Sequence, residues 1–447
     1  MYDLILKHAV LVTDSAVFPG AVGVKDGKIA AIGEVADDGA PCIDVRGQYL
    51  FPGLIDCHVH FNQPGFDSRE TFDCASSAAA VGGVTTVLDM PLNNRPATST
   101  AARMEAKKQL IAGHSWVDYA LYGALFPACY GDLAEMHAHG AVAFKGFTCD
   151  DSALFPMQPV EALPRAFAAL KPFDGLAALH CEDDVMCTRL AQEKIAAGHT
   201  ARRDYLDSRP PEAEVRAVRA ALAAAEQSGA RLHICHVSHP DAAQLIREAK
   251  ARGVRVTAET CPQYLLLTEQ DVLTRGMVCK CSPPMRTAEA RDRLWDYLLD
   301  GTIDCLCSDH SPAPMEEKDE SGPRGAFGAW SGLSGVQTTV MSMFDAIVHQ
   351  KGASPCVLAQ KMGSRPAEIF GLDRQKGRLV VGMDADFTCI DPERSWEIRP
   401  EDMRYKHKLT PFAGCRGRGA VTLTVLRGSV VYRDGVLSAV PEGKLLR

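Results

Sequence analysis

Apolar and amphipathic stretches alternate through the middle of the chain. Short apolar runs such as "LAALHCE", "RLHICHVS", "VRVTAET" and "IDCLCSDHSP" each follow a longer stretch with helical spacing, for example "EAEVRAVRAALAAAEQSG". Repeated alternation of this kind predicts β/α units. Together with "GLIDCHVHF", "VTTVLDMP" and "AVAFKGF" the units number about seven or eight, enough for a closed parallel (β/α)8 barrel. An open, doubly wound sheet is the alternative, but no G-x-G-x-x-G follows the first strand.

Both ends of the chain are rich in predicted strands. "GVKDGKIAAIG" contains an Asp-Gly hairpin signal, and "VTLTVLRGSVVYRDGVL" near the other end has the same character. Because chain termini often lie close together, we expect residues 1–51 and 375–447 to form one small β domain. Residues 52–374 would then form the barrel.

The composition is that of a large globular protein without a basic face. The 447 residues are 46% hydrophobic and 23% charged, with a formal net charge of -8 and both signs interspersed. This argues against nucleic acid as a partner. The start, "MYDLILKHAVLVTDSAV", is interrupted by Asp3, Lys7 and His8 and lacks the apolar stretch of a signal peptide or a membrane span. We therefore expect a soluble, cytoplasmic protein without membrane contact.

Sixteen cysteines are spread through this large chain, which favours reduced, mostly buried thiols over a disulfide framework. The pairs Cys279/Cys281 and Cys305/Cys307 lack the wider spacing of a structural zinc site. We expect them to be core residues.

Histidines and an aspartate fall at the predicted C-terminal ends of several strands. The two histidines of "DCHVHF" are two residues apart, so they share one side of a strand. The candidate ligands are His58, His60, His180, His236 and Asp309. Since the C-terminal strand ends of a barrel meet at one face, these side chains predict a metal site, with zinc as the default ion. They exceed the needs of one tetrahedral ion, so we expect two. His233, three residues before His236, is expected to face the opposite way and to serve packing or hydrogen bonding.

A lysine also lies near a predicted strand end. In "HGAVAFKGFTC" apolar residues surround Lys145, and a buried ammonium is costly. One interpretation is a strand end from which the lysine reaches water along its aliphatic stem. The other is a carbamate formed with carbon dioxide, which turns a cation into an anion with one oxygen for each of two metals. The candidate ligands on the other strands favour the carbamate.

These motifs resemble those of the cyclic amidohydrolases, the group that includes dihydroorotase, hydantoinase/dihydropyrimidinase and allantoinase. The similar segments are "PGLIDCHVHFNQPG", "AFKGF", "HCE", "HICHVS", "KCSPPMR" and "SDHSP". The resemblance covers nearly the whole chain and implies a (β/α)8 barrel with a small β-sandwich built from both termini. It implies the following ligand set: His58 and His60 on a buried ion, His180 and His236 on a more exposed one, carboxylated Lys145 bridging them, and Asp309 completing the first site.

Within the group, the chain looks most like allantoinase. "MPLNNRPAT" and "KHKLTPFAGCRGRGAVTLTVLRGSVVY" carry this similarity. Asn62 stands where dihydroorotases have an arginine, and "KGFTCDDS" lacks the tyrosine of dihydropyrimidinases. Gln63 in place of a common glutamate, and a short stretch after Lys145, depart from the allantoinase pattern. A hydantoinase or dihydropyrimidinase-type amidase is the alternative, and a non-enzymatic relative is a further one, although such relatives lose metal ligands.

The resemblance implies hydrolysis of a ring amide in purine and ureide catabolism, from allantoin to allantoate. Asp309 would act as general base and then as general acid. Asn93, Ser282 and Gly332 are candidate substrate contacts, with turn or barrel-rim packing as the alternative for each. A homotetramer is also implied. The Gly- and Pro-rich segment 311–329 is expected to form a loop over the barrel mouth.

Overall fold

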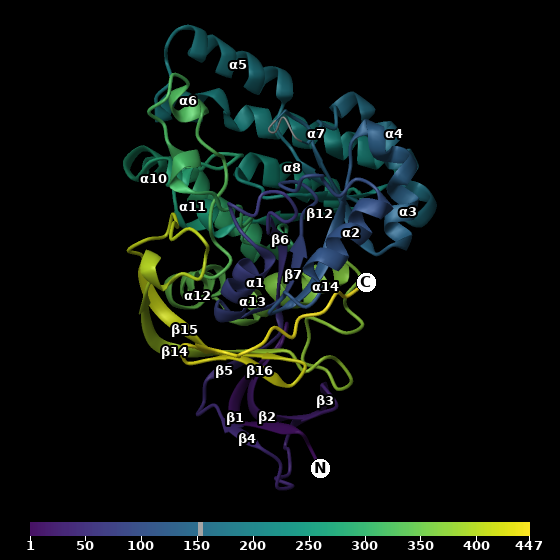
Figure 1. Cartoon of the computed structure of the whole chain (residues 1–447), viewed down its shortest axis with the longest axis vertical. Helices are drawn as coiled ribbons and strands as arrows, with labels where there is room; N and C mark the ends of the chain where they lie inside the picture. The colour runs from purple at the N-terminus through teal and green to yellow at the C-terminus, as the bar shows by residue number, and fades with distance from the viewer. Residues whose placement is uncertain (151–154) are drawn as a thin grey trace.

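Eight parallel strands form a barrel in the middle of the chain (Figure 1). The structure, a computed structural model, describes residues 1–150 and 155–447. Neighbouring strands pair in chain order, and in β9 and β10 Lys145 lies opposite Ala178. The barrel strands are β6 (Leu54–Val59), β7 (Val84–Asp89), β8 (Asp118–Ala124), β9 (Ala141–Phe147), β10 (Leu176–His180), β11 (Arg231–Ile234), β12 (Val256–Thr260) and β13 (Cys305–Leu306). The predicted barrel is confirmed.

The barrel closes between its first and last strands. A parallel bridge joins Val59 to His310, and the backbone N–H of His60 donates to His310 O at 2.7 Å. Within β6, the buried Asp56 carboxylate accepts the backbone N–H of Ser308 at 3.0 Å. These bonds hold the end of β6 against the segment that follows β13. The side chains of His60, just after β6, and Asp309, just after β13, therefore face each other.

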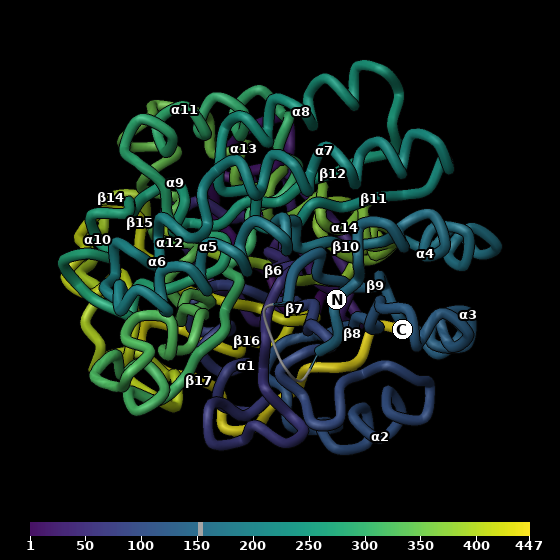
Figure 2. Tube along the Cα trace, turned by 90° about the horizontal axis from the view of Figure 1, so that it is seen from above, coloured from purple at the N-terminus to yellow at the C-terminus, as the bar shows by residue number. Residues whose placement is uncertain are grey.

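Helices follow the barrel strands and cover the outside of the barrel. Figure 2 shows α2, α3, α4 and α8 around the central strands. In α7, Ala217, Ala221 and Ala225 are buried, and their spacing of four residues places them on one face. The helices are α1 (Phe72–Val81), α2 (Ala101–Ile111), α3 (Leu133–Ala138), α4 (Leu163–Leu170), α5 (Asp184–Ala196), α6 (Arg202–Ser208), α7 (Pro211–Ser228), α8 (Pro240–Ala251), α9 (Pro262–Leu266), α10 (Glu269–Arg275), α11 (Ala288–Leu299), α12 (Thr339–Phe344), α13 (Cys356–Ala359) and α14 (Arg365–Ile369). Among the described residues, none of the helices has both the length and the apolar character to cross a membrane.

The two ends of the chain form a second, nine-stranded sheet below the barrel (Figure 1). The N-terminal β5 pairs antiparallel with the C-terminal β14, with Phe51 opposite Thr388. The sheet has its own apolar core, which includes Leu6, Val22 and Phe387. Its strands are β1 (Leu4–Val12), β2 (Val17–Lys25), β3 (Lys28–Gly33), β4 (Cys42–Asp44), β5 (Tyr49–Pro52), β14 (Phe387–Glu397), β15 (Arg416–Leu426), β16 (Ser429–Arg433) and β17 (Val436–Leu437). The separate terminal β unit is confirmed, whereas the limits 1–51 with 375–447 and 52–374 stay a prediction.

A buried ion cluster joins this sheet to the barrel. Lys376 Nζ lies 2.6 Å from Asp386 Oδ2 and 2.8 Å from Asp384 Oδ2, and it also contacts Asp118 at the start of β8. Burial alone would lower the pKa of Lys376, but the carboxylates raise it above its usual range. The lysine is therefore a fixed cation that holds three acidic side chains together.

Candidate metal centre and active site

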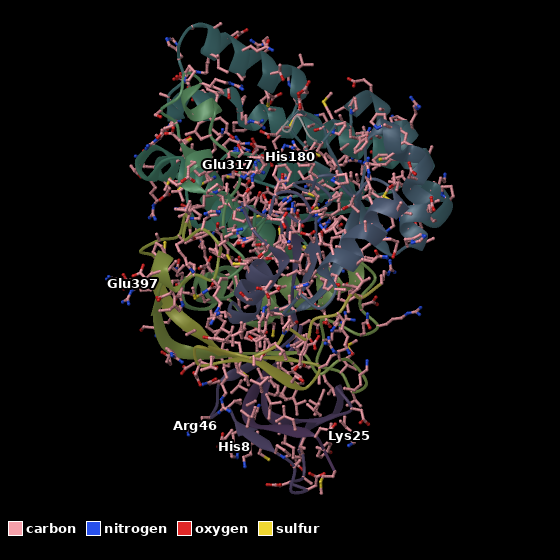
Figure 3. The ribbon with its side chains drawn as sticks, in the orientation of Figure 1. His8, Lys25, Arg46, His180, Glu317 and Glu397 are labelled. Carbon is pink, nitrogen blue, oxygen red and sulfur yellow. The ribbon has the colours of Figure 1, made fainter. Side chains whose placement is uncertain are left out.

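The six predicted ligands converge on one cavity at the C-terminal end of the barrel strands. They come from five strands: His58 in β6 and His60 just after it, Lys145 in β9, His180 at the end of β10, His236 after β11, and Asp309 after β13. All six line a cavity of about 440 Å³. Figure 3 shows His180 in the barrel part of the molecule, whereas His8 and Lys25 lie on strands of the terminal sheet and Arg46 lies in a turn between two of them. The strand-end pattern of the sequence is thus a cluster in space.

The spacing of these side chains fits metal binding. Asp309 Oδ1 lies 3.2 Å from His60 Nε2 and 3.3 Å from His58 Nε2. His180 Nδ1 lies 3.2 Å from His236 Nε2. Two ligand atoms at about 2.0–2.1 Å from a tetrahedral ion are separated by about 3.3–3.4 Å. The residues therefore fit two neighbouring ion positions, one with two histidines and the aspartate, the other with two histidines.

Lys145 is enclosed beside both groups. Its side chain has 0% exposure, and its Nζ lies 3.4 Å from His58 Nε2 and 4.9 Å from the centre of the Phe147 ring. Over residues 1–150 and 155–447, no carboxylate oxygen lies within 4.0 Å of this amine. The interpretation in which Lys145 reaches water is wrong. A buried ammonium among histidines without an acidic partner is an unfavourable arrangement.

Glu259 lies behind the first group and was not predicted from the sequence. One oxygen of this buried carboxylate contacts His58 Nδ1, and the other lies 3.2 Å from His233 Nε2. The Cys57 thiol donates to the same second oxygen at 3.2 Å. A carboxylate on the outer nitrogen of a ligand histidine fixes its tautomer and ring orientation. The signal in the sequence was a glutamate next to last in "VTAET", an otherwise uncharged strand.

Glu182 has the same relation to the second group. Its Oε2 lies 2.9 Å from His180 Nε2 and also contacts the guanidinium of Arg209. Burial alone would raise the pKa of Glu182, but Arg209 and His180 hold it at about 2. The fixed carboxylate orients His180 so that its Nδ1 faces His236. The sequence motif "HCE" includes Glu182, but the motif alone does not reveal that this glutamate orients His180.

The predicted orientation of His233 is wrong. Its ring points to Glu259, the carboxylate that also contacts His58, so it faces the same interior as His236. Strand alternation fails between the two histidines because His236 lies beyond β11 with a φ of 36°. The predicted hydrogen-bonding role is correct, since His233 Nδ1 also lies 2.8 Å from Thr257 Oγ1.

Four of the ten described residues other than glycine that have a left-handed backbone are candidate site residues or lie two residues from one. Asn62, Asn93, His236 and Asp309 have φ values of 60°, 57°, 36° and 48°. Each such residue other than glycine costs about 1–3 kcal/mol, and strain of this kind clusters at functional sites. For Asp309 burial would raise the pKa, but His58 and the other neighbouring histidines hold it below its usual range. The Asp309 carboxylate is therefore ionised.

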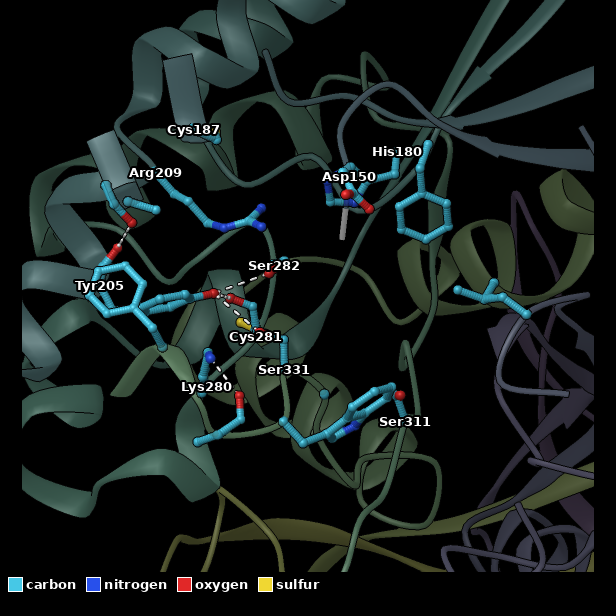
Figure 4. Close-up of a pocket in the computed structure, with 18 of the residues that line it drawn as sticks. Asp150, His180, Cys187, Tyr205, Arg209, Lys280, Cys281, Ser282, Ser311 and Ser331 are labelled. Carbon is cyan, nitrogen blue, oxygen red and sulfur yellow. Dashed lines mark hydrogen bonds between the residues drawn. The ribbon is translucent and has the colours of Figure 1, made fainter. Parts of the chain in front are cut away.

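The predicted substrate contacts all line the cavity. Asn93 Nδ2 donates to Ser311 Oγ at 3.3 Å, and Ser282 Oγ lies 3.1 Å from the Tyr205 hydroxyl (Figure 4). A Cβ on Gly332 would lie 2.5 Å from Ser311 O, so at this position the backbone itself forms the wall. The three residues belong to three different loops on the cavity rim.

Gln63 does not line the cavity, although the resemblance had drawn attention to it. Its side chain accepts the backbone N–H of Phe72 at 2.7 Å and donates to Asp67 at 2.6 Å. Its departure from the glutamate pattern therefore concerns the start of α1. The other departure, the short stretch after Lys145, runs through residues 151–154, which lie outside the described residues.

The segment 311–329 forms part of the cavity wall, as predicted, through Ser311 and Phe327. Two buried lysines hold this segment and the residues after it. Lys280 Nζ donates to the carbonyls of residues 326 and 329, and Lys318 Nζ donates to those of residues 330 and 332. Burial lowers the pKa of Lys318 to about 7. The wall is thus fixed through its backbone.

All sixteen cysteines lie in the described part of the chain, and none forms a disulfide. Thirteen of them are buried, including both members of each C-x-C pair. The prediction of reduced core thiols is confirmed.

Comparisons with known proteins agree with this geometry. The model of the amidohydrolase family matches residues 49–431. Allantoinase of Escherichia coli O1:K1 / APEC is 37% identical over 436 residues, which cover 96% of this chain and 95% of that protein. L-Hydantoinase (dihydropyrimidinase) from Arthrobacter aurescens has a TM-score of 0.96 at 34% identity and covers 100% of this chain and 99% of its own. Dihydropyrimidinase from Brevibacillus agri NCHU1002 has a TM-score of 0.92 at 27% identity, covering 99% of this chain and 98% of its own.

The family match spans all eight barrel strands and part of the terminal sheet, and the 37% identity extends over nearly the whole chain. The candidate ligands lie on the strand ends of that barrel. The chain belongs to the amidohydrolase family.

Proposed function

We propose that this protein hydrolyses a cyclic amide and that its best substrate is allantoin, which it opens to allantoate. The similarity to an allantoinase and to hydantoinases supports hydrolysis of a ring amide. The cavity of about 440 Å³ is large enough for a small ring and offers histidine, carboxylate and amide side chains on its wall.

The position of Lys145 carries the proposal. This amine is buried among the histidines without an acidic partner within 4.0 Å in the described part of the chain. The ammonium first loses one proton, and addition of carbon dioxide to the neutral amine then forms an N–C bond and releases a second proton, which leaves a carbamate with a single negative charge. Its two oxygens could each bind one ion, so the same lysine would change from an unfavourable cation into a bridging ligand.

Members of this family are typically metal-dependent, and the donor set suits zinc. His58, His60 and Asp309 would hold one ion, and His180 and His236 a second, with carboxylated Lys145 between them. Two such ions supply an activated water and a polarised carbonyl.

We assign the proton transfer to Asp309. By resemblance, its carboxylate would take the proton of the attacking water and give it to the ring nitrogen that leaves, so no net proton remains on the enzyme. Asn93, Ser282 and Gly332 would orient the ring from the rim. The outer carboxylates of Glu259 and Glu182 would keep His58 and His180 in place.

Asn62 supports a neutral ring substrate, because a carboxylated ring calls for a cationic partner. The Asn62 amide donates to His60 O at 3.0 Å, so this side chain is held within the local turn.

A hydantoin or dihydropyrimidine ring is the second candidate, favoured by the TM-score of 0.96 to the Arthrobacter aurescens hydantoinase.

The test is a substrate panel of allantoin, hydantoin, dihydrouracil and dihydroorotate on purified, metal-loaded protein. The highest kcat/KM with allantoin supports the proposal, and a higher value with dihydrouracil or a 5-substituted hydantoin rejects allantoin as the best substrate.

Elemental analysis should find two divalent ions per chain in fully active protein, and a stoichiometry of one contradicts the binuclear centre. A homotetramer, which light scattering would detect, is proposed by resemblance alone.

A further inference from the structure

Trp330 lies on the cavity wall and is held firmly in place. Its backbone N–H donates to Glu317 O at 2.6 Å, and its carbonyl accepts from Lys318 Nζ at 3.0 Å. The guanidinium of Arg69 lies 3.7 Å from the ring centre and is itself paired with the Glu317 carboxylate. The backbone and the face of the indole ring are thus both fixed.

The one polar atom of this side chain has no hydrogen-bond partner within residues 1–150 and 155–447. Trp330 Nε1 is buried and makes no hydrogen bond with any described residue. By contrast, Trp116 Nε1 donates to Asp73 Oδ1 at 3.2 Å and Trp295 Nε1 to Leu265 O at 2.9 Å. An indole nitrogen can only donate, and buried donors are normally paired. Trp396 Nε1 is also unpaired, but Trp396 belongs to β14 and does not line the cavity.

The unpaired N–H of Trp330 lies beside the proposed substrate contacts. A Cβ built on Gly332 would be 2.7 Å from Trp330 Nε1 and 2.7 Å from Ser311 Oγ, so both atoms lie close to the Gly332 backbone at the cavity wall. Ser311 Oγ in turn accepts the Asn93 amide at 3.3 Å. Figure 4 shows Ser311 and Ser331 on this side of the cavity, with Ser282 and Tyr205 beyond them.

We propose that the indole N–H of Trp330 donates a hydrogen bond to a carbonyl oxygen of the cyclic substrate other than the one attacked. The inference rests on the proposed function and adds a substrate-binding residue to it. A ring with a second carbonyl pairs the buried donor, whereas a ring without one leaves the donor unpaired. Because this bond forms with substrate and transition state alike, it lowers KM and leaves kcat nearly unchanged.

The test compares Trp330→Phe with Trp396→Phe in metal-loaded protein, using the best substrate of the panel. Both variants delete an unpaired buried indole N–H, and a phenyl ring at position 330 can still stack on Arg69. For Trp330→Phe we expect KM to rise about tenfold, the usual effect of one neutral hydrogen bond. The expected kcat and metal content stay within about twofold of the wild type, since the groups that react are untouched. Trp396→Phe should leave both constants at their wild-type values.

Two results would overturn the inference in an active protein: an unchanged KM in Trp330→Phe, or a parallel fall in kcat and metal content, which marks a distorted wall. If Trp330→Phe does not fold, 3-benzothienylalanine at position 330 repeats the test, because sulfur replaces the N–H in a ring of the same shape. Wild-type protein that opens none of the rings in the panel rejects the proposed function instead.

Discussion

Replacement of Lys145 by alanine tests the bridging carbamate most directly. The change removes Cγ, Cδ, Cε and Nζ of a side chain with 0% exposure, together with any group attached to the amine. The histidines and Asp309 remain. The vacated space is enclosed by the barrel interior and continuous with the cavity that Lys145 lines.

The expected effects on stability and on activity differ widely. Loss of three buried methylenes at about 0.8 kcal/mol each costs about 2–3 kcal/mol of folding free energy. If the Lys145 amine is charged in the wild type, removal of this buried, unpaired charge offsets part of that cost. A barrel of this size should survive that loss. Activity should fall about a thousandfold or more, because metal-assisted charge stabilisation is worth several kcal/mol and each 1.36 kcal/mol is about tenfold in rate.

The assay measures turnover, metal content and melting temperature of Lys145→Ala with and without acetate or propionate. A short carboxylic acid fits the vacated space and supplies two oxygens, so it should restore part of the activity in proportion to its concentration, and only when metal is present. Lys145→Met, which refills the space, is the matched control and should not respond to acid. Near-normal activity and full metal content in Lys145→Ala would refute the bridging role.

Three further outcomes are expected. Glu259→Gln should weaken metal binding about 10–100-fold in a chelator competition, because an amide cannot accept from both His58 and His233, and unchanged affinity would contradict the orienting role. Lys376→Met should destabilise the protein by about 3–5 kcal/mol, seen as a lower melting temperature, since three buried carboxylates lose their cation. The folded-state pKa of Lys318, about 7, lies below its ordinary value of 10.5, so the unfolded chain binds more protons between these values. Stability should therefore rise with pH from about 7 to 10 more steeply in the wild type than in Lys318→Met, and parallel melting curves would exclude this effect.

The barrel and its ligands could be predicted because the relevant signal is local. Each β/α unit repeats its own pattern, and a polar residue at the end of an apolar strand is visible in a few letters, as in "LAALH". Parallel topology then brings those ends together without any knowledge of long-range contacts. The same argument explains the error at His233, because alternation holds only while the backbone stays extended, and at His236 it does not.

The buried charged residues behind the candidate ligands and between the two sheets could not be predicted in the same way. Glu259 and Glu182 are ordinary acidic residues in the sequence, and their roles depend on which histidine nitrogen they meet across the barrel. Lys376 lies at the start of the predicted terminal segment 375–447, and its three partners come from β8 and from the loop before β14. Such contacts join residues far apart in the chain, and no periodic pattern marks them.

Substrate choice is harder to predict than reaction type for a related physical reason. The candidate metal ligands sit on or next to strands, whose geometry the barrel dictates, so their chemistry survives large changes elsewhere. The groups that would recognise the ring, among them Asn93, Ser282, Trp330 and Gly332, come from three loops whose shapes depend on cross-chain bonds such as those of Lys318. One substitution on such a loop can remove a donor without touching a ligand. Relatives with the same ligand set can therefore open different rings.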